Sequence, residues 1–505
     1  MGARARSPLG MAATLDGRSE AMLARLAEFH QRRSVVVDAE ARVLALFAEA
    51  ARDVPAYARF LRERGVDPAT VTSIEAFSRV PPTTKENYYR PNPLPDLCRH
   101  GQLEASDMVA LSTGSTGEPA VWPRFVTHEL ESSARFEQIL GGAFEAGGRR
   151  TLAVICFALG NWVGGLYTLA CCRHLAAKGY PITVVAPGNQ PAEILRALRA
   201  LSGFFDQRVL FGYPPFLKDV IDLGVSQGLD WAATPTRLVM AGEVFSEEWR
   251  AWVCSRIGAE PASATASMYG TADAGVLANE TPLSIRIRRA LARRPDAARA
   301  LFGEARLPTL CQYDPATRFF EVEGGWLLFS GDGGAPLLRY KILDRGGIIA
   351  FAEMQDFLAR HGVELEPPGF SPSGADPACA PFVYVFGRSH FALSFYGANI
   401  YPENVAVGLE QPELAPHLTG KYVMEVEHDP DQSAHLRLTV ELARGELAPD
   451  GLALQIAENV RCHLERQNSE FLSYVPRAER SPRVALRAFG DAEYFPAGVK
   501  HRYTR

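Results

Sequence analysis

The part of the sequence that points most directly to chemistry is a short run of hydroxyl residues and glycines, LSTGSTGEP, at residues 111–119. Glycines let a backbone approach an anion closely, and free N–H groups with neighbouring hydroxyls can surround a phosphate. No lysine follows the second glycine, so the run does not match the GxxxxGK[ST] phosphate loop. By itself such a run is also typical of an ordinary loop. Its candidate phosphate-binding residues are Ser112, Thr113, Gly114, Ser115, Thr116 and Gly117.

Further segments rich in glycine and charged residues follow this run in a fixed order. They are residues 241–246 (AGEVFS), 268–275 (MYGTADAG), 338–346 (LRYKILDRG) and 386–389 (FGRS), the last of which continues to 397–405 (GANIYPENV). Near the end of the sequence, Lys500 stands in the run GVKHR. One such motif is weak evidence for a function, but the whole series in this order is specific.

This series resembles the adenylate-forming superfamily of acyl-CoA synthetases, luciferases and peptide-synthetase adenylation domains. Within it the chain is most similar to the phenylacetate–CoA ligase branch. That branch is favoured by PPTTK at residues 81–85, by the missing lysine after Pro119, and by VMAGE at 239–243 running into SEE at 246–248. The resemblance covers roughly residues 75–505 and implies an α/β fold. A large N-terminal domain with mostly parallel sheets and covering helices would be followed by a small, mobile α+β C-terminal domain.

The resemblance implies that ATP binds at these segments. Residues 241–243 would form the wall against which the adenine stacks, and Tyr269 would pack on the other face of the base. Asp344 matches the aspartate that accepts both ribose hydroxyls, and Arg388 would contact the ribose or a phosphate. The alternatives are structural: a strand-end turn, a buried tyrosine, a turn aspartate and a surface salt bridge. Besides the loop, the implied cofactor-binding residues are Ala241, Gly242, Glu243, Tyr269, Gly270, Thr271, Asp344 and Arg388.

The resemblance assigns catalytic roles to Lys500, Thr116 and Asp273. Lys500 matches the lysine that reaches the α-phosphate and the attacking carboxylate, where its charge would offset the negative charge of the transition state. Asp273 stands where the family usually has a magnesium-binding glutamate, and a carboxylate oxygen suits that hard cation. Because aspartate is one methylene shorter, the metal would shift or be reached through water. The alternatives are a basic tail around Lys500 and a solvated turn carboxylate.

Members of the superfamily rotate the small domain between adenylation and thioester formation, which moves the lysine away. The hinge position is usually an aspartate or a lysine, but here it is His390, which is either an ordinary loop residue or a source of pH sensitivity. Gly397 matches the glycine beside the pantetheine tunnel, where a close approach excludes a side chain. A plain turn glycine is the alternative reading.

The acyl pocket would be lined by residues 157–165 and 211–216. Aromatic side chains in these segments suit an aromatic or otherwise flat acid, although core packing explains the same residues equally well. The candidate substrate residues are Trp162, Gly164, Tyr213, Phe216 and Gly397.

Composition narrows the class of protein. The chain has 505 residues, of which 47% are hydrophobic and 22% charged, as in ordinary globular proteins. With a net charge of −5, the chain lacks the overall positive charge that would favour binding to nucleic acid or to an anionic membrane. The eight cysteines form no CxxC pair, which indicates reduced thiols in the cytoplasm and no structural metal.

Two segments bear on targeting. Residues 1–20 are Arg-rich without an apolar core, so we expect a disordered leader rather than an export signal. Residues 151–172 are mostly apolar and long enough to span a bilayer. Glycines at 160, 164 and 165 interrupt them, which favours a strand, a turn and a buried helix.

The elements that must position these residues are predicted from periodicity. Short apolar runs alternate with helical patterns from residue 108 to about 348, which indicates largely parallel sheets with covering helices. The sequence EGG at 323–325 predicts a hairpin between 319–322 and 326–329. We expect domains at 21–387 and 388–505. Other predicted elements are helices at 21–32, 39–51, 57–64 and 451–467, and strands at 151–157, 182–185, 209–211, 237–240, 422–427 and 436–442.

An arginine-rich run at residues 286–306 looks like an insertion. It is interpreted either as a solvated helix face or as a grip for the phosphates of CoA or another anion.

These observations predict a cytoplasmic, ATP-dependent, AMP-forming carboxylic acid ligase that uses Mg²⁺ and makes an acyl-adenylate. CoA is the first-choice acceptor, and the chain would be a monomer or a homodimer without nucleic-acid or membrane partners. Three alternatives stay open. They are an amide or ester synthetase with an amine or alcohol acceptor, a cofactor adenylyltransferase, and a non-catalytic nucleotide-binding module.

Overall fold

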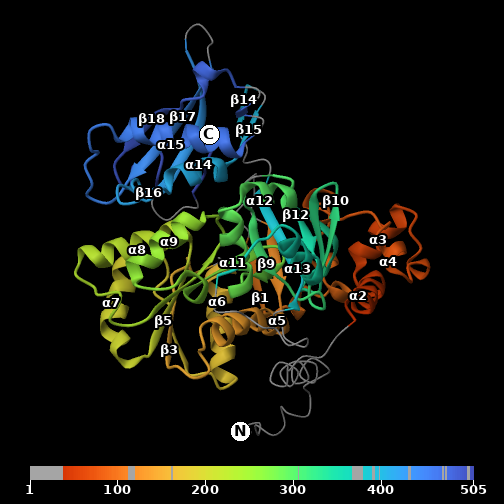
Figure 1. The fold of residues 1–505 in the computed structure, drawn as a ribbon. Helices are drawn as coiled ribbons and strands as arrows, with labels where there is room; N and C mark the ends of the chain where they lie inside the picture. The colour runs from red at the N-terminus through yellow and green to blue at the C-terminus, as the bar shows by residue number, and fades with distance from the viewer. Residues whose placement is uncertain are drawn as a thin grey trace.

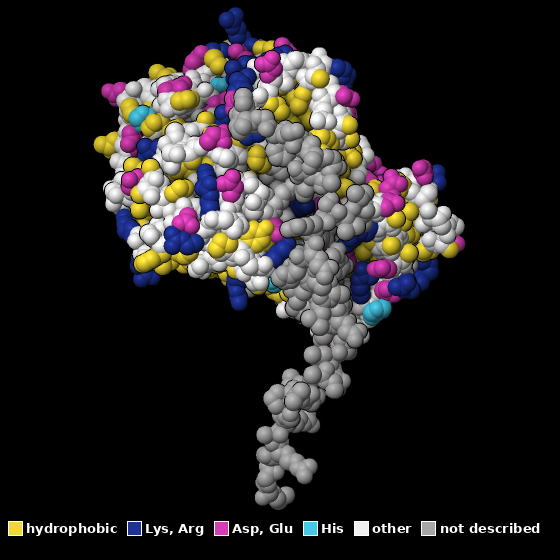
Figure 2. All heavy atoms as spheres, turned by 60° about the horizontal axis from the view of Figure 1, so that its bottom comes forward, with side chains coloured by type: hydrophobic (Ala, Val, Ile, Leu, Met, Phe, Trp, Pro, Cys, Tyr) yellow, Lys and Arg dark blue, Asp and Glu magenta, His cyan; other side chains and the backbone are white. Residues whose placement is uncertain are grey.

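The computed structural model describes residues 38–111, 120–160, 163–304, 306–366, 379–388, 393–396, 398–429, 434–468, 471–472, 475–496 and 501–504. The predicted leader at 1–20 and the predicted helix at 21–32 lie outside these residues. Within the described ranges, no helix combines the length and the apolar character needed to cross a bilayer. On the face in Figure 2, Lys/Arg and Asp/Glu side chains are interspersed, as expected for a chain of net charge −5.

An eleven-stranded sheet runs through the larger part of the molecule (Figure 1), in the order β10-β11-β12-β13-β9-β8-β7-β6-β5-β3-β4. In the parallel half of this sheet, β4, β3, β5, β6 and β7 each pair in parallel with their neighbours in the series. In the antiparallel half, neighbouring strands in the series β7, β8, β9, β13, β12, β11 and β10 pair antiparallel. The strands are β3 (Thr151–Ile155), β4 (Ile182–Val185), β5 (Gln207–Gly212), β6 (Thr236–Ala241), β7 (Thr265–Thr271), β8 (Gly275–Asn279), β9 (Thr309–Gln312), β10 (Phe319–Glu323), β11 (Trp326–Gly331), β12 (Leu337–Ile349) and β13 (Phe382–Arg388).

The parallel half is buried on both faces, which explains its uninterrupted apolar strands. All residues of β3 and β5 are buried. In β3, Ala153 and Ile155 belong to a core under α5 (Val126–Glu137) and α6 (Val163–Ala177). Leu152 and Val154 belong to a second core under α7 (Pro191–Leu201), α8 (Pro214–Ser226) and α9 (Glu247–Ile257). The predicted strand, turn and buried helix at 151–172 are thus β3 and α6, separated by a loop.

The antiparallel half contains the predicted hairpin. β10 pairs with β11, with Glu323 opposite Trp326, and the turn between them is Gly324-Gly325. Both glycines have positive φ (59° and 80°), as a two-residue hairpin turn requires. The prediction from EGG is therefore confirmed.

Helices at the start of the described chain cover this half. They are α2 (Ala39–Asp53), α3 (Pro55–Glu63) and α4 (Ile74–Phe77). Asp38 caps α2 by accepting from the N–H groups of Glu40 and Ala41. Buried residues of these helices, such as Phe47 and Phe60, share one core with β10–β12. The remaining α-helices described in the large part are α10 (Pro261–Ala264), α11 (Pro282–Ala292), α12 (Pro295–Phe302) and α13 (Phe351–Arg360).

The residues from 393 onward form separate sheets and their own core, which lie above the large part in Figure 1. We call the described residues 393–504 the small unit and those before them the large unit. In the small unit, β16 pairs antiparallel with β17, and β17 pairs in parallel with β18. Its elements are β14 (Leu393–Phe395), β15 (Ala398–Ile400), α14 (Pro402–Leu409), β16 (Leu418–His428), β17 (Ala434–Leu442), α15 (Leu452–Gln467) and β18 (Arg483–Arg487).

Candidate active site

The carboxyl ends of the parallel strands meet at one edge of the sheet, which is where ligands bind in open α/β sheets. Phe157 follows β3, Tyr213 follows β5, Gly242 follows β6 and Asp273 follows β7. The strand order β7-β6-β5-β3 places these ends side by side. The topology therefore gathers residues that the sequence spreads over more than a hundred positions.

The segment predicted to be the adenine wall is in contact with Tyr213. Gly242 has a φ of 83°, and a Cβ at this position would lie 2.7 Å from the Cε1 atom of Tyr213. Only glycine therefore allows the tyrosine ring to lie against this turn. Tyr213 also makes an edge-to-face contact with Phe157, with ring centroids 5.0 Å apart. Burial, with a smaller contribution from Glu243, raises the pKa of the Tyr213 hydroxyl.

Of the other predicted acyl-pocket residues, Gly164 lies beside Phe157, since a Cβ on it would be 4.0 Å from the ring. Phe216 does not join this group. Its side chain packs in the core under α7–α9, whereas Tyr213 packs on the α5–α6 side of the sheet. Its position on α8 turns it to the opposite face of the sheet from Tyr213, so the structure does not bring these two predicted pocket residues together. Trp162 and Gly397 lie outside the described residues.

The predicted ribose and adenine residues contact each other directly. The Tyr269 hydroxyl donates to Oδ2 of Asp344 at 2.8 Å, although β7 and β12 are separated by three strands in the sheet. Asp344 is buried and pairs through its backbone with Arg388 across β12 and β13. Of Arg388 itself, only the backbone is described. The tyrosine thus fixes the direction of the aspartate side chain.

Asp273 is buried in the turn between β7 and β8, so it is not a solvated turn carboxylate. The hydroxyl of Tyr340 donates to its Oδ2 at 2.6 Å, and Lys85 Nζ lies 3.8 Å from its Oδ1. Arg124 of β2 (Val121–Arg124) holds the turn itself by donating to the carbonyl oxygens of Ala272 and Asp273. The described residues contain no cluster of three or more potential metal ligands. A single carboxylate nevertheless fits a Mg²⁺ that is held mainly by phosphates and water.

Lys85 is a site residue that the sequence reasoning used only as part of the PPTTK motif. It begins a π-helical turn, η4 (Lys85–Tyr89), which Thr84 and Asn87 cap reciprocally. The backbone of Thr83 pairs with β12, and the Thr83 hydroxyl donates to Leu338 O at 2.8 Å. The ammonium group also lies 5.5 Å from the Trp122 ring centroid. A lysine beside a carboxylate at this edge could bind a phosphate, and the motif itself was the signal for it.

The predicted phosphate loop and the catalytic lysine lie outside the described part of the chain. Ser112, Thr113, Gly114, Ser115, Thr116, Gly117 and Lys500 are all among the residues not described. The strands on either side of the loop are described: β1 (Met108–Leu111) pairs antiparallel with β2, and Leu111 lies opposite Val121. Arg124, which contacts the Asp273 turn, lies at the other end of this strand pair, opposite Met108.

The small unit contacts this edge of the sheet. Glu243, the last residue of the predicted wall, accepts a hydrogen bond from the Tyr503 hydroxyl at 2.7 Å. The N–H of Ser246 donates to Glu410 at 2.9 Å. A cavity of about 20 Å³ lies between the two units, lined among others by Phe245, Tyr422 and Tyr503.

The arginine-rich run forms α11 and α12. Arg288 is buried and bound to Glu247 and to the Phe245 carbonyl, and Arg306 is buried against Glu403 of the small unit at 3.2 Å. These two arginines therefore belong neither to a solvent-exposed helix face nor to an anion-binding site, because both are buried in ion pairs within the chain. Arg293, with a 2.6 Å ion pair to Glu366, remains exposed, as a solvated face predicts.

Comparison with known proteins identifies the class of fold. No protein-family model and no curated protein sequence matches the chain. Among solved structures, the chain is similar to 2-hydroxyisobutyryl-CoA ligase in the postadenylation state with R3-HIB-AMP. The TM-score is 0.65 at 14% identity, over 92% of this chain and 88% of that one. The same ligase with 2-HIB-AMP and CoA in the thioesterification state gives a TM-score of 0.52 at 14% identity, over 97% and 91%.

This likeness shows that the chain has the fold of the adenylate-forming ligases, as its motifs predicted. The predicted fold class is confirmed, with parallel pairing confined to one half of the large sheet. A further structure of that ligase in the postadenylation state gives a TM-score of 0.62 at 14% identity, over 92% of this chain and 87% of that one.

Proposed function

We propose that the chain is an ATP-dependent, AMP-forming carboxylic acid ligase. It would convert a small carboxylic acid into an acyl-adenylate and transfer the acyl group to an acceptor, with CoA as first choice. One observation carries the proposal. The Gly242–Tyr213 wall, the Tyr269–Asp344 pair and the buried Asp273 converge at one edge of a sheet with the adenylate-forming ligase fold.

The nucleotide would lie along this edge. Adenine would stack against residues 241–243, with Tyr269, Gly270 and Thr271 on its other side, and the ribose hydroxyls would donate to Asp344. A carboxylate has two oxygens and can accept more than one hydroxyl donor, and the Tyr269 hydroxyl fixes the direction of this one. Arg388 would contact the ribose or a phosphate from the neighbouring strand.

The phosphates would lie between the loop Ser112–Gly117 and Lys85. Asp273 would hold the Mg²⁺ that accompanies ATP, and that ion supplies charge neutralisation for the departing pyrophosphate. Lys85 and Lys500 would offset the charge that builds up as the carboxylate attacks the α-phosphorus. Thr116 stays a candidate for the same task within the loop.

The acid would bind beside Phe157, Gly164 and Tyr213, a surface made of aromatic rings and a small residue. This lining favours a flat or aromatic acid. Trp162 and Gly397 remain proposed contacts of the acid and of the acceptor.

CoA as the acceptor is supported by the solved ligase structure that contains 2-HIB-AMP and CoA. The amide or ester synthetase, the adenylyltransferase and the non-catalytic module remain alternatives. We also propose the phenylacetate–CoA ligase-like branch, a cytoplasmic location, a monomer or homodimer, and domains at 21–387 and 388–505. These proposals rest on the sequence motifs and composition.

The test is pyrophosphate release from ATP and Mg²⁺ across a panel of aromatic and aliphatic acids, with and without CoA. We expect release that depends on one class of acid and a faster turnover when CoA is added. Release that needs an amine instead of CoA would favour the synthetase. Measurable ATP binding with no release under any acid would contradict the proposed function.

A further inference from the structure

The last described residues of the chain connect the small unit to the predicted adenine wall. The Tyr503 hydroxyl donates to Oε2 of Glu243 at 2.7 Å, and the two residues are 260 positions apart in the sequence. Glu243 directly follows Gly242, whose turn is fixed by the Tyr213 ring. The contact therefore joins the small unit to the part of the large unit that would face the nucleotide.

On its own side, Tyr503 is held rigidly by the small unit. Its carbonyl accepts from the Met424 N–H at 2.7 Å, and Thr504 forms a bridge with Met424 of β16. His501 is 2.7 Å from the Tyr422 carbonyl and contacts the Tyr503 ring edge-on at 4.6 Å. The segment 501–504 thus lies against β16 of the small sheet, and the Tyr503 hydroxyl reaches across to Glu243.

The surroundings of Tyr503 strengthen its hydrogen bond to Glu243. The aromatic rings of Tyr422 and Tyr503 lie 5.0 Å apart, and both line the small cavity between the units. Burial and the nearby Glu243 raise the pKa of the Tyr503 hydroxyl well above its ordinary value, so the hydroxyl remains a donor at neutral pH. A hydrogen bond from a hydroxyl to a carboxylate in a partly dehydrated interface is stronger than a hydrogen bond between two neutral groups in water.

The arrangement that this contact stabilises corresponds to one stage of the proposed reaction. The TM-scores to the postadenylation structures (0.65 and 0.62) exceed those to the open and thioesterification structures of the same ligase (both 0.52). In sequence, Lys500 immediately precedes the tail at 501–504. The contact of Tyr503 with Glu243 is therefore close in sequence to the proposed adenylation lysine.

We propose that Tyr503 is a positioning residue, whose hydrogen bond to Glu243 holds the small unit against the nucleotide wall for adenylation and breaks when the acyl group is transferred. This inference rests on the proposed function. It adds a residue on the tail that acts through Glu243 and touches neither the substrate nor the reacting atoms.

The first test measures the two half-reactions separately in the variant Tyr503→Phe. This substitution removes only the hydroxyl. We expect the adenylation rate to fall about tenfold, the size of effect that a hydrogen bond to a charged group supports. Nucleotide affinity should stay unchanged, and acyl transfer from a pre-formed acyl-adenylate should be as fast as in the wild type or faster. The matched control is Tyr422→Phe, which also removes a buried hydroxyl but one bound inside the small unit, to Pro402 O.

A double-mutant cycle tests the partner. Glu243→Gln keeps an oxygen that can accept from Tyr503, so adenylation should fall less than in Tyr503→Phe. Tyr503→Phe should then lower the adenylation rate clearly less in the Glu243→Gln background than in the wild type. The reason is that the effects of substituting two residues in contact are not additive. Full additivity of the two substitutions would overturn the assignment of Glu243 as the partner.

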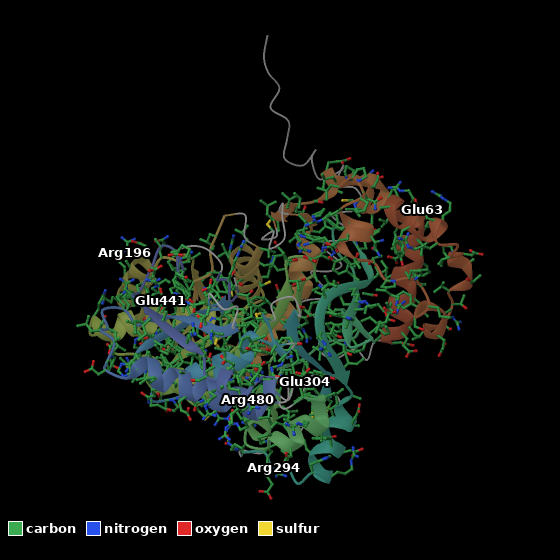
Figure 3. The ribbon with its side chains drawn as sticks, turned by 90° about the horizontal axis from the view of Figure 1, so that it is seen from above. Glu63, Arg196, Arg294, Glu304, Glu441 and Arg480 are labelled. Atoms are coloured by element: carbon green, nitrogen blue, oxygen red, sulfur yellow. The ribbon has the colours of Figure 1, made fainter. Side chains whose placement is uncertain are left out.

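A second readout does not depend on activity. Spin labels at Arg196→Cys on α7 and Leu454→Cys on α15, both strongly exposed, would report the distance between the units once the accessible Cys379 and Cys462 are replaced by serine. Figure 3 shows Arg196 on the outer side of the large unit. We expect one dominant distance in the wild type and in Tyr422→Phe, and an added population in Tyr503→Phe.

The outcomes are distinguishable. If the wild type adenylates no acid, the proposed function fails, and the distance measurement still decides whether Tyr503 holds the units together. If Tyr503→Phe leaves both adenylation and the distances unchanged, the proposal is overturned. It is equally overturned if both half-reactions slow to the same extent with unchanged distances, because that pattern marks a general loss of structure.

Discussion

At the scale of single residues, the candidate site is built from hydroxyl–carboxylate pairs. Tyr269 donates to Asp344 and Tyr340 donates to Asp273, and both aspartates are buried. A buried carboxylate that accepts a hydrogen bond from a tyrosine hydroxyl has a fixed direction. These pairs therefore orient the two groups that the proposed reaction assigns to the ribose and to Mg²⁺.

Asp344→Asn tests the ribose assignment. The amide can still accept from Tyr269, but it carries no charge and one of its two oxygen acceptors is gone. We expect ATP and AMP to bind at least about tenfold more weakly, as for loss of a hydrogen bond to a charged group. Titration calorimetry measures this, with Asp296→Asn in the first turn of α12 as a control. Unchanged affinity in Asp344→Asn would remove the ribose role.

Lys85→Met tests the residue that the structure adds to the site. Methionine keeps most of the aliphatic length beside Trp122 but removes the charge 3.8 Å from Asp273. Since a phosphate-binding lysine acts most strongly on the transition state, we expect a fall of about a hundredfold in adenylation rate. Single-turnover pyrophosphate release measures it. A rate within twofold of the wild type would exclude Lys85 from the phosphate site.

At the scale of elements, strand ends and turns decide which side chains meet. β6 ends in a turn whose glycine has positive φ, and the following helix α9 begins at the Ser246 cap, whose hydroxyl accepts from Trp249 N–H. Between them lie the residues of the wall, which contact Tyr213 on one side and Tyr503 on the other. The wall is therefore fixed by both of the units that it joins.

Gly242→Ala tests this turn. Alanine would be strained at a φ of 83°, and its Cβ would lie 2.7 Å from the Tyr213 ring. Gly258→Ala is the matched control, because it has a φ of 65° but an ordinary contact of 3.6 Å. We expect both to lower the free energy of unfolding, and Gly242→Ala to lower it by about 1 kcal/mol more because of the clash. Urea unfolding measures the difference, and equal losses would mean that the tyrosine ring moves away freely.

At the scale of the whole molecule, polar contacts hold the small unit on the large one. Lys218 donates to Leu418 O at 2.6 Å, and Lys421 bridges Asp219 of α8 (3.0 Å) and Glu441 of β17 (3.2 Å). In the view from above (Figure 3), the small unit, which carries Glu441 and Arg480, lies over the large unit. Polar contacts of this kind are common at interfaces between two units of one chain.

We expect Glu410 to make this interface pH-dependent. Burial raises its pKa to about 7, while hydrogen bonds from Ser246 oppose the rise and Glu248 adds to it. A raised pKa means that the docked state favours the protonated carboxyl. The contribution of Glu410 to the stability of the folded, docked state is therefore complete below the ordinary glutamate pKa near 4.5. It is lost as the pH rises to about 7. Over that range the folded, docked state loses up to about 3 kcal/mol.

Glu410→Gln should abolish this loss, because the amide stays neutral and still accepts from the Ser246 N–H. The measurement is the free energy of unfolding of both proteins at pH 5 and pH 8. The wild type should lose more stability than the variant between these values, while other titrating groups cancel in the comparison. Parallel pH profiles for the two proteins would contradict the raised pKa.

The sequence by itself determined the local elements and the order of the motifs. The strand predicted at 182–185 is β4 without change, and the helix predicted at 451–467 is α15 within one residue. The hairpin at EGG was equally readable. These features depend on periodicity and turn chemistry, which are encoded within a few neighbouring residues.

Only the tertiary structure decided which distant residues meet. The contacts of Lys85 with Asp273 and of Tyr503 with Glu243 join positions far apart in the chain, and the Tyr269–Asp344 bond crosses intervening strands. The packing of Phe216 on the α7–α9 side was not predictable, because the phase of its helix relative to the sheet cannot be read from an aromatic-rich run. Strand order and the choice of face result from burying both sides of the sheet at once, which is a property of the whole chain and not of any segment.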